Sequence, residues 1–225
     1  MFRDRVDAGQ QLARRLMDYA ERDDVLVLGI PRGGVPVAFE VAQALHAPLD
    51  ILLVRKLGAP GERELAMGAI ASGGIRILDQ ELIADLGITE EQLAETIAEQ
   101  EAELERREQF YRGVRPGICV QGKIVILVDD GIATGSSMRA AIDALRSLQP
   151  KKIVVATPVA TPRANGQINR VADNFVSVLK PEWFFAIGEF YERFPQIEHA
   201  EVRALLSRAA EPVVSTAKSG RRGAA

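Results

Sequence analysis

The chain has 225 residues, of which 47% are hydrophobic and 26% charged, and a formal net charge of -3. This composition predicts one sizeable hydrophobic core, and the near-neutral charge gives no reason to expect a nucleic-acid partner. The single cysteine, Cys119, excludes an intrachain disulfide and a cysteine-based zinc cluster. Since no apolar run is long enough to cross a membrane and the N-terminus lacks a signal-peptide core, we expect a cytoplasmic protein without membrane contact.

The first part of the chain alternates helical and strand patterns. Residues 7–22 have apolar residues at helical spacing and predict a helix, and the apolar run 25–30 predicts a buried strand. A glycine loop with Arg32, Gly33 and Gly34 follows this strand and leads into a helical pattern. Because strand, glycine loop and helix make an anion-binding arrangement, these three residues are candidate phosphate ligands, although structural glycine turns are also common.

A third apolar run, residues 49–54, predicts another strand and ends in Arg55 and Lys56. Two cations at the carboxyl end of a buried strand would add positive charge for a polyanion, the alternative being a solvated strand end. Residues 58–74 hold five glycines and one proline and predict a mobile loop, with a hairpin arm leading into residues 75–78.

Residues 79–116 form a charge-rich segment that we interpret as a helical insertion. Asp79 can cap a short helix, and Thr89 with Gln92 forms a capping-box pattern that starts a second helix ending near Arg112. The apolar stripe of the second helix is narrow. A helix of this kind usually rests as a solvated arm on the body of the protein or on a partner subunit.

The most informative stretch follows the apolar run 124–128, which predicts a strand buried on both faces. Asp129 and Asp130 end the strand, and a loop of small and hydroxyl residues, 131–137, leads into an amphipathic helix. The helix N-terminus and the hydroxyls make a cup for a phosphate monoester, and the carboxylates can accept hydrogen bonds from vicinal sugar hydroxyls. The ligand indicated is a sugar phosphate.

Two more strands are predicted at residues 152–156 and 175–179. The alternation of strands and helices indicates an α/β fold with a mostly parallel central sheet flanked by helices, and the loops at the carboxyl ends of its strands should meet at one cleft. Residues 179–200 are rich in aromatic side chains, and the composition of residues 211–225 predicts a disordered tail.

The sequence VDDGIATGSS resembles the phosphoribosyl pyrophosphate (PRPP) motif of the type I phosphoribosyltransferases. The resemblance implies a single domain over residues 1–210, ribose hydroxyls held by Asp129 and Asp130, and pyrophosphate bound by the loop with Arg32, Gly33 and Gly34. It also implies Mg²⁺, a small-molecule acceptor, a homodimer, and Arg55 and Lys56 facing pyrophosphate. The residues that the resemblance assigns to the 5-phosphate are Ala133, Thr134, Gly135, Ser136 and Ser137.

The segment 179–200 resembles the hood of the hypoxanthine-guanine type enzymes, which completes the nucleobase pocket. By that resemblance Trp183 stacks on the base, Ile132 belongs to the same pocket, and Glu189 lies near the acid that holds magnesium through water. The alternative is that the aromatic residues close the core, which we favour for Phe185 and Phe190.

Two departures bear on the acceptor. Ala133 stands where the hypoxanthine-guanine type carries an acid, and Val159 stands where it carries a lysine that reads the purine oxygen. Adenine-type enzymes also carry Ala in the loop and take an acid from the mobile loop, so Glu62 and Glu64 are candidate bases. Both can equally be solvated loop residues.

We therefore expect a Mg-dependent transferase that moves the 5-phosphoribosyl group from PRPP to a nitrogenous, nucleobase-like acceptor and releases pyrophosphate. A second hypothesis is a regulatory protein that binds PRPP or a nucleotide on the same fold without catalysis. A dinucleotide-binding domain built on Gly33 and Gly34 is a weaker third hypothesis, because the Gly-x-Gly-x-x-Gly spacing is missing.

Overall fold

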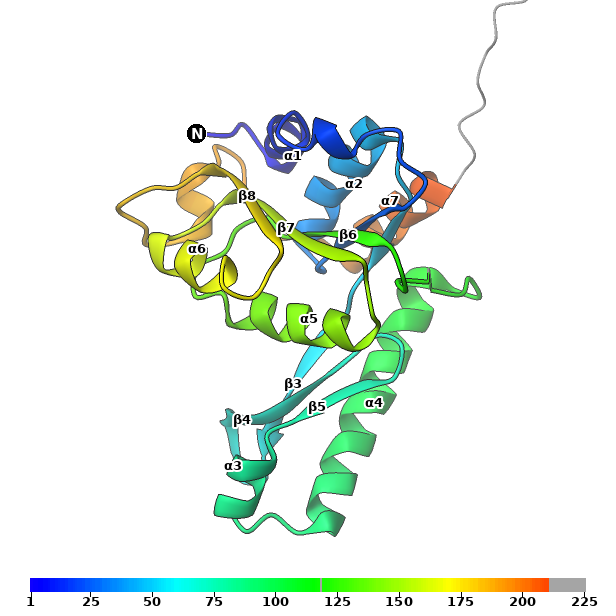
Figure 1. Ribbon diagram of the computed structural model, residues 1–225, viewed down its shortest axis with the longest axis vertical. Coiled ribbons are helices and arrows are strands. Elements are labelled where there is room, and N and C mark those ends of the chain that lie inside the picture. Colours follow the sequence, from blue (N-terminus) through cyan, green and yellow to red (C-terminus); the bar gives the residue numbers. More distant parts are fainter. Residues whose placement is uncertain (118, 211–225) are drawn as a thin grey trace, which may run out of the picture.

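A computed structural model of the chain describes residues 1–117 and 119–210, except for the side chains of residues 63 and 64. The predicted tail, 211–225, lies outside these described residues. Figure 1 shows a body, built on a parallel sheet with helices on both faces, and an arm that projects from it. The expected α/β fold with a mostly parallel central sheet is confirmed.

The strands are β1 (Val25–Gly29), β2 (Leu49–Ile51), β3 (Val54–Ala59), β4 (Glu62–Ala71), β5 (Ile75–Leu78), β6 (Ile124–Val128), β7 (Lys152–Val159) and β8 (Asn174–Leu179). The α-helices are α1 (Arg5–Ala13), α2 (Gly34–Leu45), α3 (Gln80–Asp85), α4 (Glu90–Arg112), α5 (Ser136–Ser147), α6 (Pro162–Ile168) and α7 (His199–Ala210). Two short 3-10 helices are η1 (Met17–Tyr19) and η2 (Ile187–Phe190).

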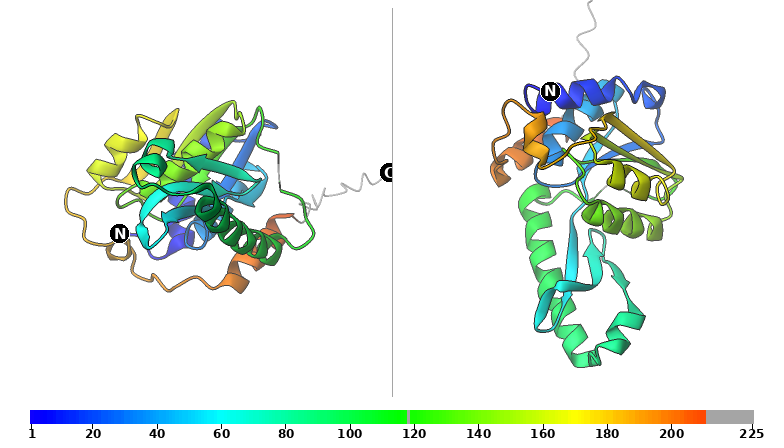
Figure 2. Two further views of the ribbon diagram at one scale, coloured as in Figure 1. Left: turned by 90° about the horizontal axis from the view of Figure 1, so that it is seen from below. Right: turned by 90° about the vertical axis from the view of Figure 1, so that its left-hand side faces the viewer.

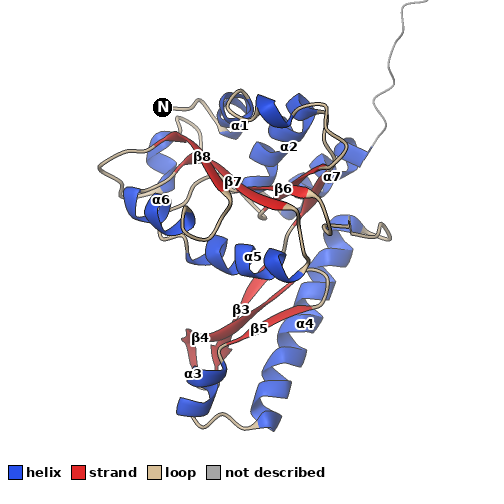
Figure 3. Ribbon diagram, in the orientation of Figure 1, coloured by secondary structure: helices blue, strands red, loops and turns tan. Residues whose placement is uncertain are grey.

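The body sheet has the order β2-β1-β6-β7-β8, and every neighbouring pair is parallel. Its strands are apolar runs because both faces are covered (Figure 3). Val25 and Val27 point to the core beneath α1, α2 and α7, whereas Leu26 and Leu28 point to the core beneath α5 and α6. This arrangement brings the carboxyl ends of β1 and β6 together at one edge.

The predicted first helix is shorter than expected and starts earlier. Asp4 caps α1, since its side chain accepts a hydrogen bond from the N–H of Asp7 at 3.0 Å. The helix ends at Ala13, and only the 3-10 turn η1 continues the predicted segment 7–22.

The arm corrects two predictions. The apolar run 49–54 is not one strand, because β2 ends at Ile51 and β3 begins at Val54, so Arg55 and Lys56 lie inside β3 and not at the end of a body strand. Residues 58–74 are mostly β4 and the end of β3, which pair antiparallel, and not an open loop. A glycine within this segment misled the prediction: a Cβ at Gly68 would lie 2.3 Å from the carbonyl oxygen of Ile77, so the close approach of β5 requires glycine.

The two predicted helices of residues 79–116 are present as α3 and α4. The side chain of Asp79 accepts from the N–H of Leu82, and Thr89 with Gln92 forms the capping box of α4. Figure 2 shows α4 running alongside the β3–β4 hairpin, where Ile97 and Leu104 are buried. The apolar stripe thus packs against the arm's own sheet.

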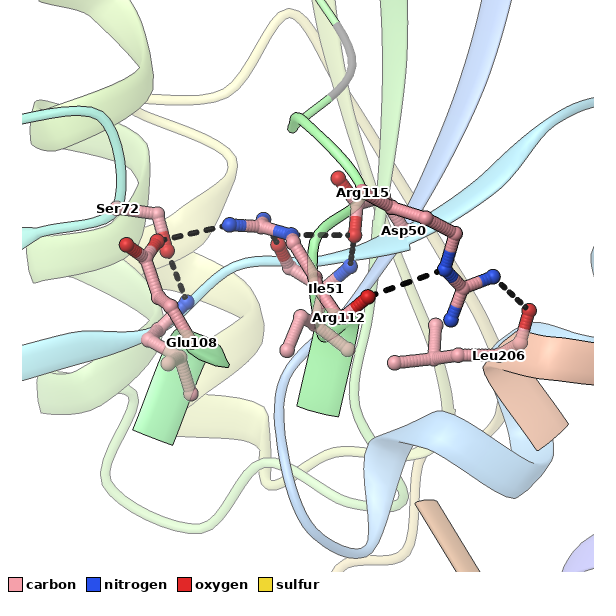
Figure 4. A network of polar contacts seen from close by, with 8 residues as sticks. Asp50, Ile51, Ser72, Glu108, Arg112, Arg115 and Leu206 are labelled. Carbon is pink, nitrogen blue, oxygen red and sulfur yellow. Dashed lines mark hydrogen bonds and ion pairs between the residues drawn. The ribbon is translucent and has the colours of Figure 1, made fainter. Parts of the chain in front are cut away.

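A polar network joins the end of α4 to the body (Figure 4). Arg112 donates to Asp50 at 2.9 Å, to Glu108 at 2.8 Å and to the carbonyl of Ile51 at 2.7 Å. Arg115 continues the network by donating to the carbonyl oxygens of Arg112 and Leu206. The arm is therefore anchored on the edge strand β2 and on α7.

The aromatic segment before α7 packs against the first residues of the chain. Phe2 and Tyr191 form an isolated parallel bridge, and both side chains are buried. The prediction that Phe185 closes the core is wrong, because its side chain is 85% exposed on an irregular stretch, whereas Phe190 packs on Phe184.

Among the described residues, none of the helices has the length and apolar character needed to cross a membrane.

Candidate functional site

The two predicted binding loops meet at the carboxyl ends of β1 and β6. Gly33 and Gly34 begin α2 and pack directly on the acidic pair. A Cβ at Gly33 would lie 2.0 Å from Oδ2 of Asp130, and a Cβ at Gly34 would lie 2.9 Å from Cα of Asp129. Only glycine permits this approach, so the two loops form one continuous site.

The two carboxylates have different surroundings. Asp130 is buried, and its Oδ2 accepts a hydrogen bond of 2.8 Å from Nε of Arg5. Asp129 is half-buried, and its Oδ1 accepts from the backbone N–H of Asp130 at 2.9 Å. Asp129 is thus the more accessible acid, while Asp130 is held from inside the body.

Both acids are shifted toward the protonated form. Burial raises the pKa of Asp129 well above its ordinary value, and the neighbouring Asp130 carboxylate raises that pKa further. Burial also raises the pKa of Asp130, but the Arg5 guanidinium opposes this effect. A pair of acids, one buried beside Arg5 and one half-buried, is suited to a ligand that donates hydrogen bonds, such as a diol.

The loop after the acids is an open cup at the start of α5. Gly135 has φ +79° and caps the helix, and the side chains of Thr134, Ser136 and Ser137 are exposed, as is Ala133. The hydroxyls of Thr134 and Ser136 lie 3.3 Å apart. Exposed hydroxyls and the N–H groups of a helix start favour an anion here.

Lys56 faces this cup from the arm. A cleft of about 760 Å³ between the hairpin and α5 is lined by Lys56, Gly135, Ser136 and Arg139, among others. Because successive residues of a strand point to opposite faces, Arg55 points the other way, toward α4. The predicted pair of cations is therefore divided between two sides of the arm.

Arg32 and Arg55 come together on the other side, at a cavity of about 220 Å³. Three residues that were not predicted from the sequence line the same cavity: Arg107, Tyr111 and His199. Arg107 comes from α4, three residues after the buried Leu104 and so on the same helical face. That spacing is the signal that distinguishes Arg107, whose side chain is 46% exposed, from Arg106, whose side chain is 77% exposed.

The charges at this cavity are mostly positive. Glu103 lies between two of the arginines, at 2.7 Å from Nε of Arg107 and 3.7 Å from a guanidinium nitrogen of Arg55. Burial lowers the pKa of Arg55, and the neighbouring Arg107 lowers it further. Glu99 also acts on Arg55, but the three guanidinium groups that line the cavity still favour an anion there.

The other predicted site residues are not brought together by these loops, and one of them lies partly outside the described residues. Glu62 is exposed at the tip of the hairpin, and the side chain of Glu64 lies outside the described part of the chain. Trp183 is 81% exposed, whereas Ile132 is buried in the core beneath α5. Glu189 accepts a long hydrogen bond of 3.4 Å from the N–H of Phe185. Their roles stay predictions.

The donor set for a metal is sparse. Within the described residues, three or more His, Cys, Asp or Glu side chains do not gather in a way that could hold a metal ion. These side chains alone therefore do not form a closed metal cage, whereas a site shared with the phosphate groups of a ligand needs only one or two carboxylates.

Comparison with known proteins places this geometry in a family. A model of the phosphoribosyl transferase domain matches residues 3–194. Two curated proteins of Mycobacterium tuberculosis, "Putative phosphoribosyl transferase MT0597" (strain CDC 1551 / Oshkosh) and "Putative phosphoribosyl transferase Rv0571c" (strain ATCC 25618 / H37Rv), are each 43% identical over 209 residues, or 93% of this chain. The chain spans only 47% of the length of each of these two relatives.

A solved structure agrees with the fold. The crystal structure of TT1426 from Thermus thermophilus is 40% identical, with a TM-score of 0.82, and the match covers 93% of this chain and 99% of that one. The domain match spans both strand-end loops and the acidic pair. The chain belongs to the phosphoribosyl transferase domain family.

Proposed function

We propose that the chain is a pentosyltransferase that moves the 5-phosphoribosyl group of PRPP to a nitrogenous, nucleobase-like acceptor and releases pyrophosphate. The observation that carries this proposal is the direct packing of the Gly33–Gly34 loop on Asp129 and Asp130, with the hydroxyl cup next along the chain. One ligand that carries a diol between two phosphate groups would occupy all three features.

The ribose 5-phosphate end would lie over β6. The exposed cup at residues 133–137 supports phosphate binding through N–H groups and hydroxyls, and Lys56 adds a positive charge from the arm. Asp129, the more accessible acid, would accept hydrogen bonds from the ribose hydroxyls. These contacts would fix the sugar ring relative to both loops.

The pyrophosphate end would lie toward the cavity of Arg32, Arg55 and Arg107. Its excess positive charge supports binding of a leaving group that gains negative charge as its bond breaks. Two of the three arginines belong to the arm, so the arm would add positive charge to the leaving-group binding that Arg32 of the body provides.

The reaction exchanges one bond at C1 of the ribose. The bond from C1 to the pyrophosphate oxygen breaks, and its electron pair leaves with pyrophosphate, while a nitrogen lone pair of the acceptor forms the new bond. Positive charge develops on the ribose between these events, and the nearby carboxylate of Asp129 favours it. The arm would keep water away from C1.

Mg²⁺, a homodimer and a cytoplasmic location are part of the same proposal. Since the described side chains form no metal cage, Mg²⁺ would be held together with the phosphate groups of the ligand and would offset the charge of the departing pyrophosphate. The acceptor is left open, because Ala133 and Val159 replace the residues that would read a 6-oxopurine.

A non-catalytic PRPP-binding or nucleotide-binding regulator is the second candidate. The exposed position of Glu62, at the hairpin tip, favours it, because this candidate base does not approach the acidic pair in the arrangement described. Release of pyrophosphate separates the two candidates.

The test is a pyrophosphate-release assay with PRPP, Mg²⁺ and a panel of purine and pyrimidine bases. Release that depends on one base would establish the transferase and identify its acceptor. Tight PRPP binding without release for every base would favour the regulator. A protein that neither binds PRPP nor releases pyrophosphate would contradict both candidates.

A further inference from the structure

A buried arginine near the start of the chain, Arg5, contacts the acidic pair. Arg5, the first residue of α1, is 7% exposed, and its Nε lies 2.8 Å from Oδ2 of Asp130, which is 8% exposed. The proposed reaction does not use this ion pair directly. A buried charge pair is costly to form, so its position beside the acids needs an explanation.

The same guanidinium also holds the aromatic segment that precedes α7. A second nitrogen of Arg5 donates to the carbonyl of Pro195 at 2.8 Å, and the guanidinium carbon lies 3.7 Å from the ring centroid of Phe194. Tyr191 stacks near Phe194, with ring centroids 4.7 Å apart, and its hydroxyl donates to the backbone carbonyl of Asp130 at 2.6 Å. Arg5 therefore holds the side chain of Asp130, and Tyr191 holds its backbone carbonyl.

The backbone of the N-terminus reinforces this contact. The N–H of Phe2 donates to the carbonyl of Phe190, and the N–H of Glu192 donates to the carbonyl of Phe2, both at 2.8 Å. Arg193 and Asp4 add an ion pair at 2.7 Å. Two segments almost 190 positions apart in sequence thus converge on Asp130.

A displacement of Asp130 would also move Asp129, and it would thereby change ligand binding. The carboxylate of Asp129 accepts from the N–H of Asp130, and the carboxylate of Asp130 forms the floor against which Gly33 packs. Without Arg5, the buried Asp130 carboxylate would lose its cation while Asp129 remains beside it. It would then turn away or take up a proton, and the ribose-binding geometry would change.

We propose that Arg5 is a positioning residue that fixes the acidic pair for the ribose of PRPP and ties it to residues 190–195. This inference rests on the proposed function, because it assigns the acids to the ribose hydroxyls. It distinguishes the two ends of the ligand: Arg5 supports the diol-binding acids, whereas the pyrophosphate end is lined by three other arginines.

The experiment compares the full chain with Arg5→Ala, Arg5→Lys and Arg3→Ala by calorimetric titration with PRPP and, separately, with inorganic pyrophosphate, both with Mg²⁺. Arg3 is the matched control, since it lies two residues away, is 69% exposed and forms an i,i+4 ion pair with Asp7. Arg5→Lys keeps the positive charge and guards against a loss of folding in Arg5→Ala, and thermal unfolding is recorded for each variant.

For Arg5→Ala we expect PRPP binding to weaken by about 30-fold or more, a typical effect of removing one partner of a buried pair, and pyrophosphate binding to stay within about 2-fold. Arg5→Lys should recover part of the loss, and Arg3→Ala should bind both ligands as the wild type does. Unchanged PRPP affinity in Arg5→Ala would overturn the proposal, and so would an equal loss for both ligands, because that pattern indicates a general structural role. Wild-type protein that fails to bind PRPP would contradict the proposed function itself, and the Arg5 assignment with it.

Discussion

The body and the arm are stabilised in different ways, and they contribute different parts of the proposed site. Both faces of the body sheet are packed with apolar side chains, and its loops supply the acids and the phosphate cup. The arm is a three-stranded sheet with one long charged helix, anchored to the body by the Arg112 network, and it supplies Lys56, Arg55 and Arg107. Under the proposed function, the body would recognise the sugar phosphate, and the arm would add positive charge at both of its phosphate ends.

The largest effect is expected at the acid of the body. Asp129→Asn should weaken PRPP binding by about 1000-fold, because an amide replaces the accessible carboxyl group that is proposed to accept hydrogen bonds from the ribose. The control is the same titration with pyrophosphate, which should change little. Equal PRPP affinity in the variant and the wild type would remove Asp129 from the site.

The same substitution should stabilise the fold at neutral pH. The pKa of Asp129 is higher in the folded chain than the unfolded value of about 3.9, so the folded state binds more protons between these two values. Wild-type stability should therefore fall as pH rises through this window, and the whole penalty is present above it. Thermal unfolding at several pH values should show a smaller fall for Asp129→Asn, and an identical pH profile would contradict the assignment.

The next largest effect is expected where the arm is attached to the body, and it concerns the stability of the fold. Arg112→Ala should reduce the free energy of unfolding by about 3 kcal/mol, because it removes the guanidinium group that donates to the buried Asp50 and to the carbonyl of Ile51. Arg76→Ala is the control within the arm, since Arg76 and Glu101 form a partly exposed pair worth less than about 1 kcal/mol. Equal losses in denaturant unfolding would mean that the network is not the anchor.

A substitution where the two loops pack together should cause a smaller loss of stability. Gly33→Ala should cost about 2 kcal/mol and weaken PRPP binding, because its methyl group would overlap the Asp130 carboxylate. Gly166→Ala, in α6 with open space around it, should be neutral or slightly stabilising. A harmless Gly33→Ala, measured by the same denaturant unfolding, would separate the loop from the acid.

The smallest effect is expected for the contribution of α4 to pyrophosphate binding. Arg107→Gln should weaken pyrophosphate binding by about 10-fold, since one of three guanidinium groups is lost from the cavity, while Arg106→Gln, 77% exposed on the same helix, should have no effect. Affinities are compared at low and high salt. Identical behaviour of the two variants would exclude α4 from the pyrophosphate end.

Much of the body could be predicted from sequence, because its strands are continuous apolar runs that end in distinctive loops. The acids, the hydroxyl cup and the Gly33–Gly34 loop all follow such runs, and the structure places them side by side. The arm was harder. Residues 49–54 form one apolar run but two strands, and Gly68 looks like a loop residue although it serves strand packing.

Contacts between distant segments could not be predicted from local patterns. Arg5 is one charged residue in a polar N-terminal turn, and its burial depends on Asp130, Phe194 and Pro195, which reach it only in the folded chain. Arg107 belongs to a run of charges in which only the position of Leu104 marks the inner face. The single-domain interpretation of residues 1–210 stays a prediction.

The most direct test of the two-ended site is a calorimetric comparison of PRPP, ribose 5-phosphate and pyrophosphate on the wild-type chain with Mg²⁺. If body and arm bind opposite ends of one ligand, PRPP should bind at least about 100-fold more tightly than either fragment, because the second contact becomes intramolecular. PRPP that binds no more tightly than ribose 5-phosphate would contradict the account, since the arginines of the cavity would then take no part in holding the pyrophosphate.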